Sequence, residues 1–408
     1  MSEVAVIGAG AAGLVAAYFA AKNGNKVTVF EKNEKSGKKI YITGKGRCNV
    51  THDCTPEEFL ENVVSNPKFM TGAIYSFSPE KCVQFFEDGG LKLKLERGAR
   101  YFPVSDKASD VTRCLENYCK SAGVTFKYNE KVLNIGILHS TMSDITTTKG
   151  KYSVDKVVVC TGGLSYPSTG STGDGYEFAK EAGHKIIPLK QGLCGLNLKG
   201  DYYKSMQGLT LKNVNLSVFN DEKLVKSFFG EMLFTHFGVS GPIVLSSSSL
   251  INRLDLKQIK LILDLKPALT DEQLDKRLLR DFEACKNKSI SNCLKELLPV
   301  ALIPEVLKRS GIKPEIQVNS ITKAQRLSLL TTVKNFVMIV ASLRDFSEAI
   351  ITCGGVDVKE INPKTMESKL VKGLYFCGEV LDLDAFTGGF NLQIAFSTGF
   401  VAGNSIKD

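Results

Sequence analysis

Three glycines near the start of the chain have the spacing of a dinucleotide-binding turn. Gly8, Gly10 and Gly13 stand between an apolar run at residues 4–7 and a second one at 14–21. In such a turn the first glycine permits a tight bend, the second lets backbone approach a pyrophosphate, and the third lets the following helix pack on the preceding strand. The free N–H groups of that helix then face the phosphates. The residues expected to bind the dinucleotide here are Gly8, Gly10, Ala11, Ala12 and Gly13.

An acidic residue completes this unit. Residues 26–30, Lys-Val-Thr-Val-Phe, are typical of a strand, and Glu31 follows directly. A carboxylate about 20 residues beyond the glycine turn can accept hydrogen bonds from a ribose hydroxyl. Because strand, glycine turn, helix, strand and acid occur in the required order, we interpret residues 4–31 as a βαβ nucleotide-binding unit. We expect Glu31 and Lys32 at the nucleotide.

The segment that follows, residues 37–51, is rich in glycine and lysine. Such a loop suits a diphosphate and the edge of a flavin, whereas its lysines alone would equally fit a solvated basic loop. The thiol of Cys48 is either a redox group beside the flavin or a small residue that fits a tight loop, and we favour the second interpretation. The residues expected at the cofactor are Lys39, Gly46, Arg47, Cys48 and Asn49.

Five stretches of the sequence together resemble one family, the FAD-binding flavoproteins that include aminoacetone oxidase and the bile-acid-pathway reductase BaiN. They are the glycine turn at 8–13, the loop at 43–51, residues 161–167 with 172–175, residues 233–238 and residues 373–393. These stretches are distributed from one end of the chain to the other. The resemblance implies an FAD cofactor and the fold of the two-dinucleotide-binding flavoproteins, while the substrate differs among family members.

The resemblance also implies further cofactor contacts. It places the backbone of Val132 beside the adenine and residues 387–393 at the flavin. The glycine-dense residues 170–175, which contain Asp174, are either part of the cofactor site or a plain loop. The further residues expected at FAD are Val132, Thr161, Gly162, Gly163, Asp174, Gly378, Glu379, Gly389, Phe390, Asn391 and Leu392.

Two of these segments have a physical reason to lie at a cofactor. Residues 161–163, Thr-Gly-Gly, follow a Val-rich run at 152–160 that we interpret as one strand, and open α/β sheets bind ligands just beyond their strands. Near the end of the chain, Gly388 and Gly389 precede an apolar helix expected over 394–402. The N–H groups at the start of this helix can stabilise the anion of reduced flavin.

The order of the elements predicts an α/β fold. A Rossmann-like FAD-binding domain of the two-dinucleotide-binding flavoprotein type is interrupted by an inserted β-rich domain with a small helical subdomain. Short alternating runs after Pro188 indicate the inserted strands, and helical spacing from Thr270 to about Lys334 indicates the helices. The expected boundaries are 1–190 with 345–408 for the FAD-binding domain, 191–268 with 336–344 for the β-rich domain and 269–335 for the helical subdomain.

Composition fits a globular enzyme. The 408 residues are 43% hydrophobic and 23% charged, contain no apolar run of eighteen residues and begin almost at once with a strand, so we expect a cytoplasmic protein without a membrane span or signal peptide. Eleven cysteines are scattered without a C-x-x-C pair, which argues against a disulfide relay, and no metal site is expected. The net charge of +9 is dispersed without an arginine-rich stripe, which favours a small-molecule substrate over nucleic acid.

Candidate catalytic groups are few. His236 lies in the motif Phe-Thr-His-Phe-Gly and could donate a proton or hold a carbonyl, although a structural role is the commoner one for such a histidine. Arg344 could hold an acidic substrate or pair with a carboxylate of its own chain. Because the sequence has a single nucleotide fingerprint, we expect NAD(P)H to dock transiently against the flavin, which carries the redox chemistry.

Three functions remain open. The preferred one is an NAD(P)H-linked reductase that passes hydride to an activated C=C bond, such as that of a steroid-like or bile-acid-like enone. The second is an oxidase of a small amine such as aminoacetone, with O₂ as acceptor. The third, of another class, is an FAD-bearing RNA-binding or RNA-modifying protein. Flavin bleaching by NAD(P)H, peroxide formation with an amine and salt-dependent RNA affinity distinguish the three.

Overall fold

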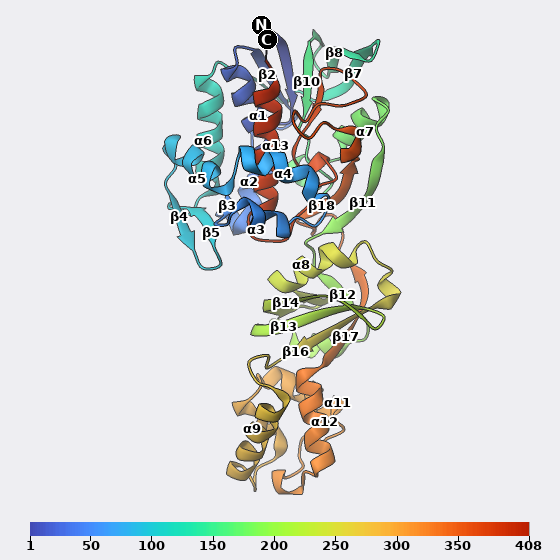
Figure 1. Ribbon diagram of the computed structural model, residues 1–408. Coiled ribbons are helices and arrows are strands. Elements are labelled where there is room, and N and C mark those ends of the chain that lie inside the picture. The colour runs from blue at the N-terminus through green and yellow to red at the C-terminus, as the bar shows by residue number, and fades with distance from the viewer. Residues whose placement is uncertain (408) are drawn as a thin grey trace. The chain divides into compact units, whose positions relative to one another are not determined.

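A computed structural model describes residues 1–407 of the chain (Figure 1). The chain divides into two compact units, Met1–Gly192 with Phe346–Asp408, and Leu193–Asp345. The second unit is therefore an insertion into the first. Each unit has a hydrophobic core of its own.

A five-stranded sheet forms the centre of the first unit. Its strand order is β19-β10-β1-β2-β6, and every neighbouring pair is parallel. The strands are β1 (Glu3–Ile7), β2 (Lys26–Glu31), β6 (Thr125–Tyr128), β10 (Lys156–Val159) and β19 (Leu374–Phe376). Parallel strands covered on both faces carry near-continuous apolar runs, as Val4–Ile7 does here. The Rossmann-like α/β fold class is confirmed.

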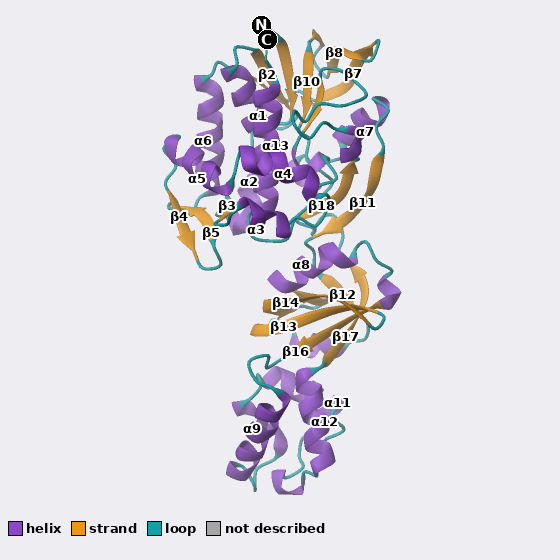
Figure 2. Ribbon diagram, viewed as in Figure 1, coloured by secondary structure: helices purple, strands orange, loops and turns teal. Residues whose placement is uncertain are grey.

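Two helices with apolar residues on most sides pack against each other beside the glycine turn. They are α1 (Ala11–Lys22) and α13 (Phe390–Ser405) (Figure 2). Most residues of both helices are buried. Their backbones touch, because a Cβ added at Gly399 would lie 2.5 Å from the carbonyl oxygen of Ala12, and one at Gly403 would lie 2.4 Å from that of Ala16. These glycines therefore allow the body of α13 to pack closely against α1.

The remaining elements of the first unit surround this centre. Its other helices are α2 (Lys38–Ile42), α3 (Pro56–Glu61), α4 (Pro67–Ser76), α5 (Pro79–Asp88), α6 (Ala108–Ser121) and α7 (Asp174–Glu181). Three small sheets are built from β3 (Thr51–His52), β5 (Arg100–Pro103) and β4 (Leu93–Glu96), from β7 (Val132–Leu138), β8 (Thr141–Thr147) and β9 (Lys151–Ser153), and from β11 (Ile186–Gly192) and β18 (Ile351–Val356).

The second unit is a closed barrel with added helices. The barrel order is β12-β15-β14-β13-β16-β17, with β12 (Leu196–Leu198), β13 (Thr210–Asn220), β14 (Lys223–Phe234), β15 (Gly238–Ser240), β16 (Ile259–Asp264) and β17 (Phe336–Leu343). The helices are α8 (Pro242–Ile251), α9 (Asp271–Ala284), α10 (Ile290–Cys293), α11 (Ile303–Arg309) and α12 (Lys323–Lys334). The expected β-rich insertion with helices after about residue 270 is thus present.

Four local expectations are wrong. The run at 152–160 is two strands in different sheets, because the side chain of Asp155 accepts a hydrogen bond from the N–H of Glu3 between them. The loop at 37–51 contains α2, and the final helix begins at Phe390 rather than at 394. Helix α8 also interrupts the strands of the insertion. Its four consecutive serines, residues 246–249, are buried, although a run of polar residues is usually exposed.

None of the helices within residues 1–407 has the length and apolar character needed to cross a membrane.

Candidate flavin site

The glycine turn has the geometry that its sequence predicts. Gly8 has a φ of +103°, and its N–H donates to the carbonyl oxygen of Phe30 at 2.9 Å. A Cβ added at Gly13 would lie only 1.9 Å from the carbonyl oxygen of Gly8, so any side chain there would separate α1 from the turn. A Cβ at Gly10 would have no atom within 4 Å. The backbone at Gly10 is therefore open to a ligand.

The start of α1 has no side-chain cap. Its N-cap is Gly10, which supplies no side-chain cap, and its first turn contains no acidic residue. Helix N-termini of this kind favour phosphate. The segment after β19 lies beside it, because a Cβ at Gly378 would be 2.8 Å from the Cβ of Ala12. Residues far apart in the sequence thus meet at the carboxyl edge of the parallel sheet.

Glu31 lies at the end of β2 and is 8% exposed. Its Oε2 accepts a hydrogen bond from the N–H of Ala9 at 2.9 Å, within the glycine turn. Its Oε1 accepts from the N–H and Nδ2 of Asn33 at 2.8 and 2.7 Å. The carboxylate therefore fixes the turn to the end of β2. Its contact with a ribose stays a prediction.

Lys32 and Asp174, both expected at the cofactor, bind each other. Lys32 Nζ lies 2.7 Å from Asp174 Oδ2, and Lys131 Nζ lies 3.1 Å from Oδ1. Burial alone would raise the pKa of Asp174, but the hydrogen bonds and charges of the two lysines outweigh it and hold the pKa below its usual value. Val132, the next residue, is buried at the start of β7. Lys32, Asp174 and Val132, all predicted at the cofactor, thus lie near one another.

A second polar cluster surrounds Glu379. Its Oε2 accepts from Lys39 Nζ at 2.8 Å, and its Oε1 accepts from the N–H of Thr352 at 2.8 Å and from Ser165 Oγ at 2.9 Å. Lys39 also donates to Ser165 Oγ at 2.7 Å. A Cβ at Gly163 would lie 2.3 Å from Thr352 Oγ1, so only glycine fits against this cluster. The cluster ties the 161–163 turn to the segment after β19.

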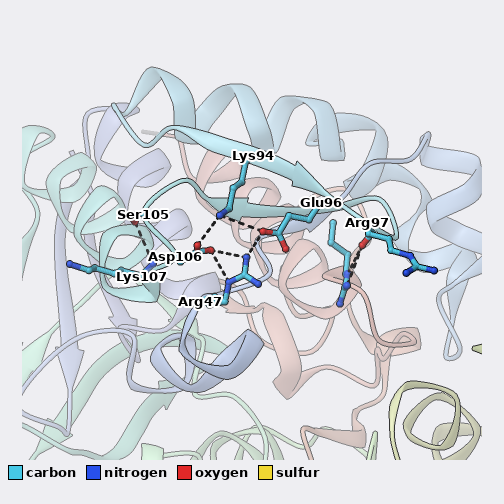
Figure 3. A network of polar contacts seen from close by, with 8 residues as sticks. Arg47, Lys94, Glu96, Arg97, Ser105, Asp106 and Lys107 are labelled. Atoms are coloured by element: carbon cyan, nitrogen blue, oxygen red, sulfur yellow. Dashed lines mark hydrogen bonds and ion pairs between the residues drawn. The ribbon is translucent and has the colours of Figure 1, made fainter. Parts of the chain in front are cut away.

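Arg47 forms ion pairs with two carboxylates, in the hairpin β4–β5 and just after it, and is not free to bind a ligand through an unpaired charge. Its guanidinium donates to Glu96 and, at 2.7 Å, to Asp106, and Lys94 binds the same two carboxylates (Figure 3). It also lies over the ring of Phe102, 4.2 Å from the centroid. Two carboxylates therefore already neutralise its charge. A direct contact between Arg47 and FAD stays a prediction.

Cys48 fits the structural interpretation of this thiol. It is fully buried and has a φ of +60°. Burial raises its pKa to about 12, against a smaller opposing effect of a hydrogen bond with Thr43. Since a thiol with a raised pKa stays protonated below that value, Cys48 supplies no thiolate at neutral pH.

We therefore expect Cys48 to resist alkylation in the native protein at mildly alkaline pH. Iodoacetamide labelling followed by mass spectrometry of the peptides measures this. The half-buried Cys285 is the internal control and should be modified first. Labelling of Cys48 at the rate of Cys285 would contradict the assignment.

The start of α13 lies against β3, whose first residue, Thr51, ends the predicted flavin loop. Its N-cap is Gly389, with a φ of +101° and no side-chain cap, and a Cβ there would lie 2.7 Å from the carbonyl carbon of Thr51. Phe390 is buried, and Asn391 exchanges hydrogen bonds with the backbone of Ala385 at 2.8 and 3.0 Å. The predicted flavin loop and the predicted flavin helix are thus in contact.

These residues fit FAD. Within residues 1–407, the buried atoms Asn49 Oδ1 and Thr161 Oγ1 have no hydrogen-bond partner, although both adjoin segments of the site. Such atoms are usually paired in native structures, so a polar ligand is the expected partner. Two uncapped helix starts and an open glycine backbone suit a diphosphate. Contacts join segments of the predicted site that are far apart in the sequence: Ala9 with Glu31, Lys32 with Asp174, Lys39 with Glu379, Ala12 with Gly378 and Thr51 with Gly389.

Two features escape sequence reasoning. His52, the residue after Thr51, packs against the start of α13, and only its position beside the predicted loop hints at this. Cys160 and Cys377 are free thiols 217 positions apart with Sγ atoms 3.1 Å apart, so a search for C-x-x-C does not find them. Burial raises the pKa of Cys160 well above its usual range, which makes the pair a poor thiolate relay.

The two candidate catalytic residues of the second unit lie at one aromatic ring. The guanidinium of Arg344 is 4.4 Å from the ring centroid of Phe237, and the ring of His236 meets the same ring edge-on at 5.1 Å. Arg344 also donates to Asn197 Oδ1 at 3.4 Å, and the buried Thr235 Oγ1 has no partner among the described residues. His236 itself is exposed. The structure thus brings His236 and Arg344 together.

Comparisons with known proteins give relatives along the whole chain. The 3-dehydro-bile acid delta(4,6)-reductase of Clostridium scindens is 30% identical and covers 100% of both chains. The ribosomal RNA dihydrouridine synthase of Haemophilus influenzae is 30% identical over 100% of this chain and 98% of its own, and that of Escherichia coli is 29% identical over 99% and 98%.

Solved structures share the fold. The 3-ketosteroid-delta4-(5alpha)-dehydrogenase of Rhodococcus jostii matches 99% of this chain and 97% of its own with a TM-score of 0.55 and 15% identity. The 3-ketosteroid delta1-dehydrogenase of Sterolibacterium denitrificans covers 100% and 99% with a TM-score of 0.53 and 12% identity. At these identities the likeness concerns the fold alone.

A family model described as the HI0933-like protein Rossmann domain matches residues 2–405. With the relatives above, it confirms the resemblance to the BaiN-type flavoproteins. The chain therefore belongs to the HI0933-like family and is an FAD-dependent oxidoreductase.

Proposed function

We propose that the protein reduces a C=C bond conjugated to a carbonyl, with NAD(P)H as the source of electrons. The observation that carries this proposal is the pair of reactions named by its full-length relatives. Both a delta(4,6)-reductase of a 3-keto bile acid and a dihydrouridine synthase saturate a C=C bond that is conjugated to a carbonyl. One chemistry thus unites relatives whose substrates differ in size.

Reduced FAD, when bound, supplies a hydride to the β-carbon of such a bond. The protein must then hold the carbonyl, which gains negative charge, and deliver one proton to the α-carbon. Arg344 has the chemistry for the first task, because a guanidinium donates to oxygen and stays charged. The exposed imidazole of His236 has the chemistry for the second. The ring of Phe237, 4.4 Å from the guanidinium carbon of Arg344, holds it by a cation–π contact.

The single nucleotide fingerprint supports transient binding of NAD(P)H. The glycine turn and Glu31 are assigned to FAD, so the nicotinamide donor reduces the flavin and then leaves. The reductase name of the Clostridium scindens relative favours this reaction over oxidation of a small amine.

Substitution of Arg344 tests its assigned role. We expect Arg344→Met to lower kcat/KM for an enone by about 100-fold or more, as the loss of an oxyanion donor does, with FAD content unchanged. Arg280→Met, which removes an exposed guanidinium of the same unit, is the matched control. Equal kcat/KM values for the two variants would show that Arg344 takes no part in the reaction.

The reaction itself is tested with pre-reduced protein. Holoprotein reduced anaerobically with one equivalent of dithionite is mixed with 4-androstene-3,17-dione, and the return of flavin absorbance is followed. Rapid reoxidation with formation of the saturated ketone supports the proposal. Reoxidation by O₂ alone, with no reaction of the enone or of a uridine-containing RNA, would contradict it.

Ribosomal RNA is the second candidate substrate, and a charge asymmetry favours it. Residues 193–345 contain 22 Lys and Arg against 15 Asp and Glu, a net charge of +7 out of the +9 of the whole chain. A basic unit suits a polyanion. If RNA is the substrate, affinity for ribosomal RNA falls steeply with salt, and treated RNA gains two hydrogens by mass spectrometry. Weak RNA binding that does not change with salt would contradict an RNA substrate and leave the small enone as the candidate substrate.

A further inference from the structure

His52 is a titratable side chain held against the start of α13. Its Nδ1 lies 3.2 Å from the carbonyl oxygen of Gly388, and its ring stacks on Phe390, with 4.6 Å between centroids and 27° between planes. Gly388 has a φ of +131°, and a Cβ there would lie 2.9 Å from the ring of Phe390 and 3.4 Å from His52 Nδ1. The ring is therefore fixed in one place at the segment assigned to FAD.

These contacts also fix the tautomer. A carbonyl oxygen only accepts hydrogen bonds, so Nδ1 of the neutral imidazole carries the proton. Nε2 is then the atom that gains or loses a proton when His52 titrates. A proton on Nε2 would therefore lie at a fixed position beside the first turn of α13.

The surroundings of His52 keep it neutral near pH 7. Burial is the largest effect and lowers its pKa, the hydrogen bond to Gly388 and the carboxylates of Asp53 and Glu58 oppose this, and Arg100 adds to the lowering. The net pKa is below the usual 6.5. The first turn of α13 contributes no acidic residue. A new negative charge near the ring would act against the effect of burial and raise the pKa of His52.

We propose that His52 is a proton-linked positioning residue of the flavin site, neutral beside oxidised FAD and protonated at Nε2 beside reduced FAD. The inference rests on the proposed function. The hydride from NAD(P)H brings one hydrogen and one negative charge to the cofactor, and NAD(P)⁺ leaves. His52 takes one proton from solvent and so places a positive charge that balances the new negative one. Protonation of His52 thereby favours the reduced cofactor.

The four histidines of the chain make this measurable. Holoprotein with isotope-labelled histidine is titrated by NMR in the oxidised form and after reduction with dithionite under argon. We expect the pKa of one imidazole to rise by about one unit or more on reduction, since a nearby opposite charge shifts a pKa by that much. The signal should be missing in His52→Gln and in His52→Asn. His139→Gln, which removes an exposed imidazole, should leave the shift unchanged.

Three outcomes overturn the inference. If each of the four histidines keeps its own pKa when the FAD of the loaded protein is reduced, His52 has only a structural role. The proposed function stands in that case. If the protein binds no FAD, its visible absorbance shows this before any titration, and the cofactor assignment falls together with the role of His52. A shift that belongs to His184 or His236 instead would also contradict the assignment.

Discussion

Gly10→Val should yield a folded protein that has lost FAD. A side chain at this position meets no atom of the chain within 4 Å, so folding tolerates it, but it enters the space in which the backbone is open to a pyrophosphate. Flavin absorbance per mole of purified protein measures the loss, and circular dichroism reports the fold. Gly150→Val is the matched control, because a Cβ there is also free of contacts but lies far along the chain in the β8–β9 turn.

Gly13→Val separates cofactor binding from folding. Its Cβ would collide with the carbonyl oxygen of Gly8 at 1.9 Å, so this variant should lose both FAD and thermal stability. Full FAD content in Gly10→Val would refute the assignment of the glycine turn. Equal destabilisation of Gly10→Val and Gly13→Val would refute the distinction between an open glycine and a packed one.

Glu379→Ala should strongly destabilise the first unit. The side chains of Lys39 and Glu379 are 24% and 20% exposed. Removal of the carboxylate takes away the only negative charge that residues 1–407 pair with the Lys39 ammonium and the acceptor of the Thr352 N–H, and leaves Lys39 only its hydrogen bond to Ser165 Oγ. Loss of one partner of a largely buried ion pair costs about 3 kcal/mol of unfolding free energy. Urea unfolding in the presence of excess FAD measures the change in midpoint.

The exposed pair of Glu34 and Lys38 provides the comparison. It joins residues four apart on the surface, with Glu34 58% exposed, and Glu34→Ala should leave the urea midpoint almost unchanged. Equal midpoints for Glu34→Ala and Glu379→Ala would show that the cluster at Glu379 does not hold the site together.

The parts of the site that the sequence predicts are those set by local rules. Gly8, Gly10 and Gly13 each have a steric task that depends on the turn itself, and the structure gives each glycine the expected surroundings. Glu31 is likewise placed by the end of its own strand. Because these constraints act within about thirty residues, the βαβ unit can be predicted from the sequence without knowledge of tertiary contacts.

The parts that the sequence does not predict depend on contacts between distant segments. His52 meets Gly388 across 336 positions, and the thiols of Cys160 and Cys377 meet across 217. No spacing rule links such residues. The division of 152–160 into two strands has the same origin, because it depends on a bond from Glu3 to Asp155. Local apolar periodicity contains no signal for it.

Anaerobic reduction of the purified holoprotein tests the central claim most directly. NADH, NADPH and aminoacetone are added separately, and bleaching of the flavin absorbance is followed. An FAD-dependent reductase is bleached by at least one nicotinamide and not by the amine. Bleaching by aminoacetone alone, with peroxide formed on admission of air, would contradict the reductase and establish an amine oxidase instead.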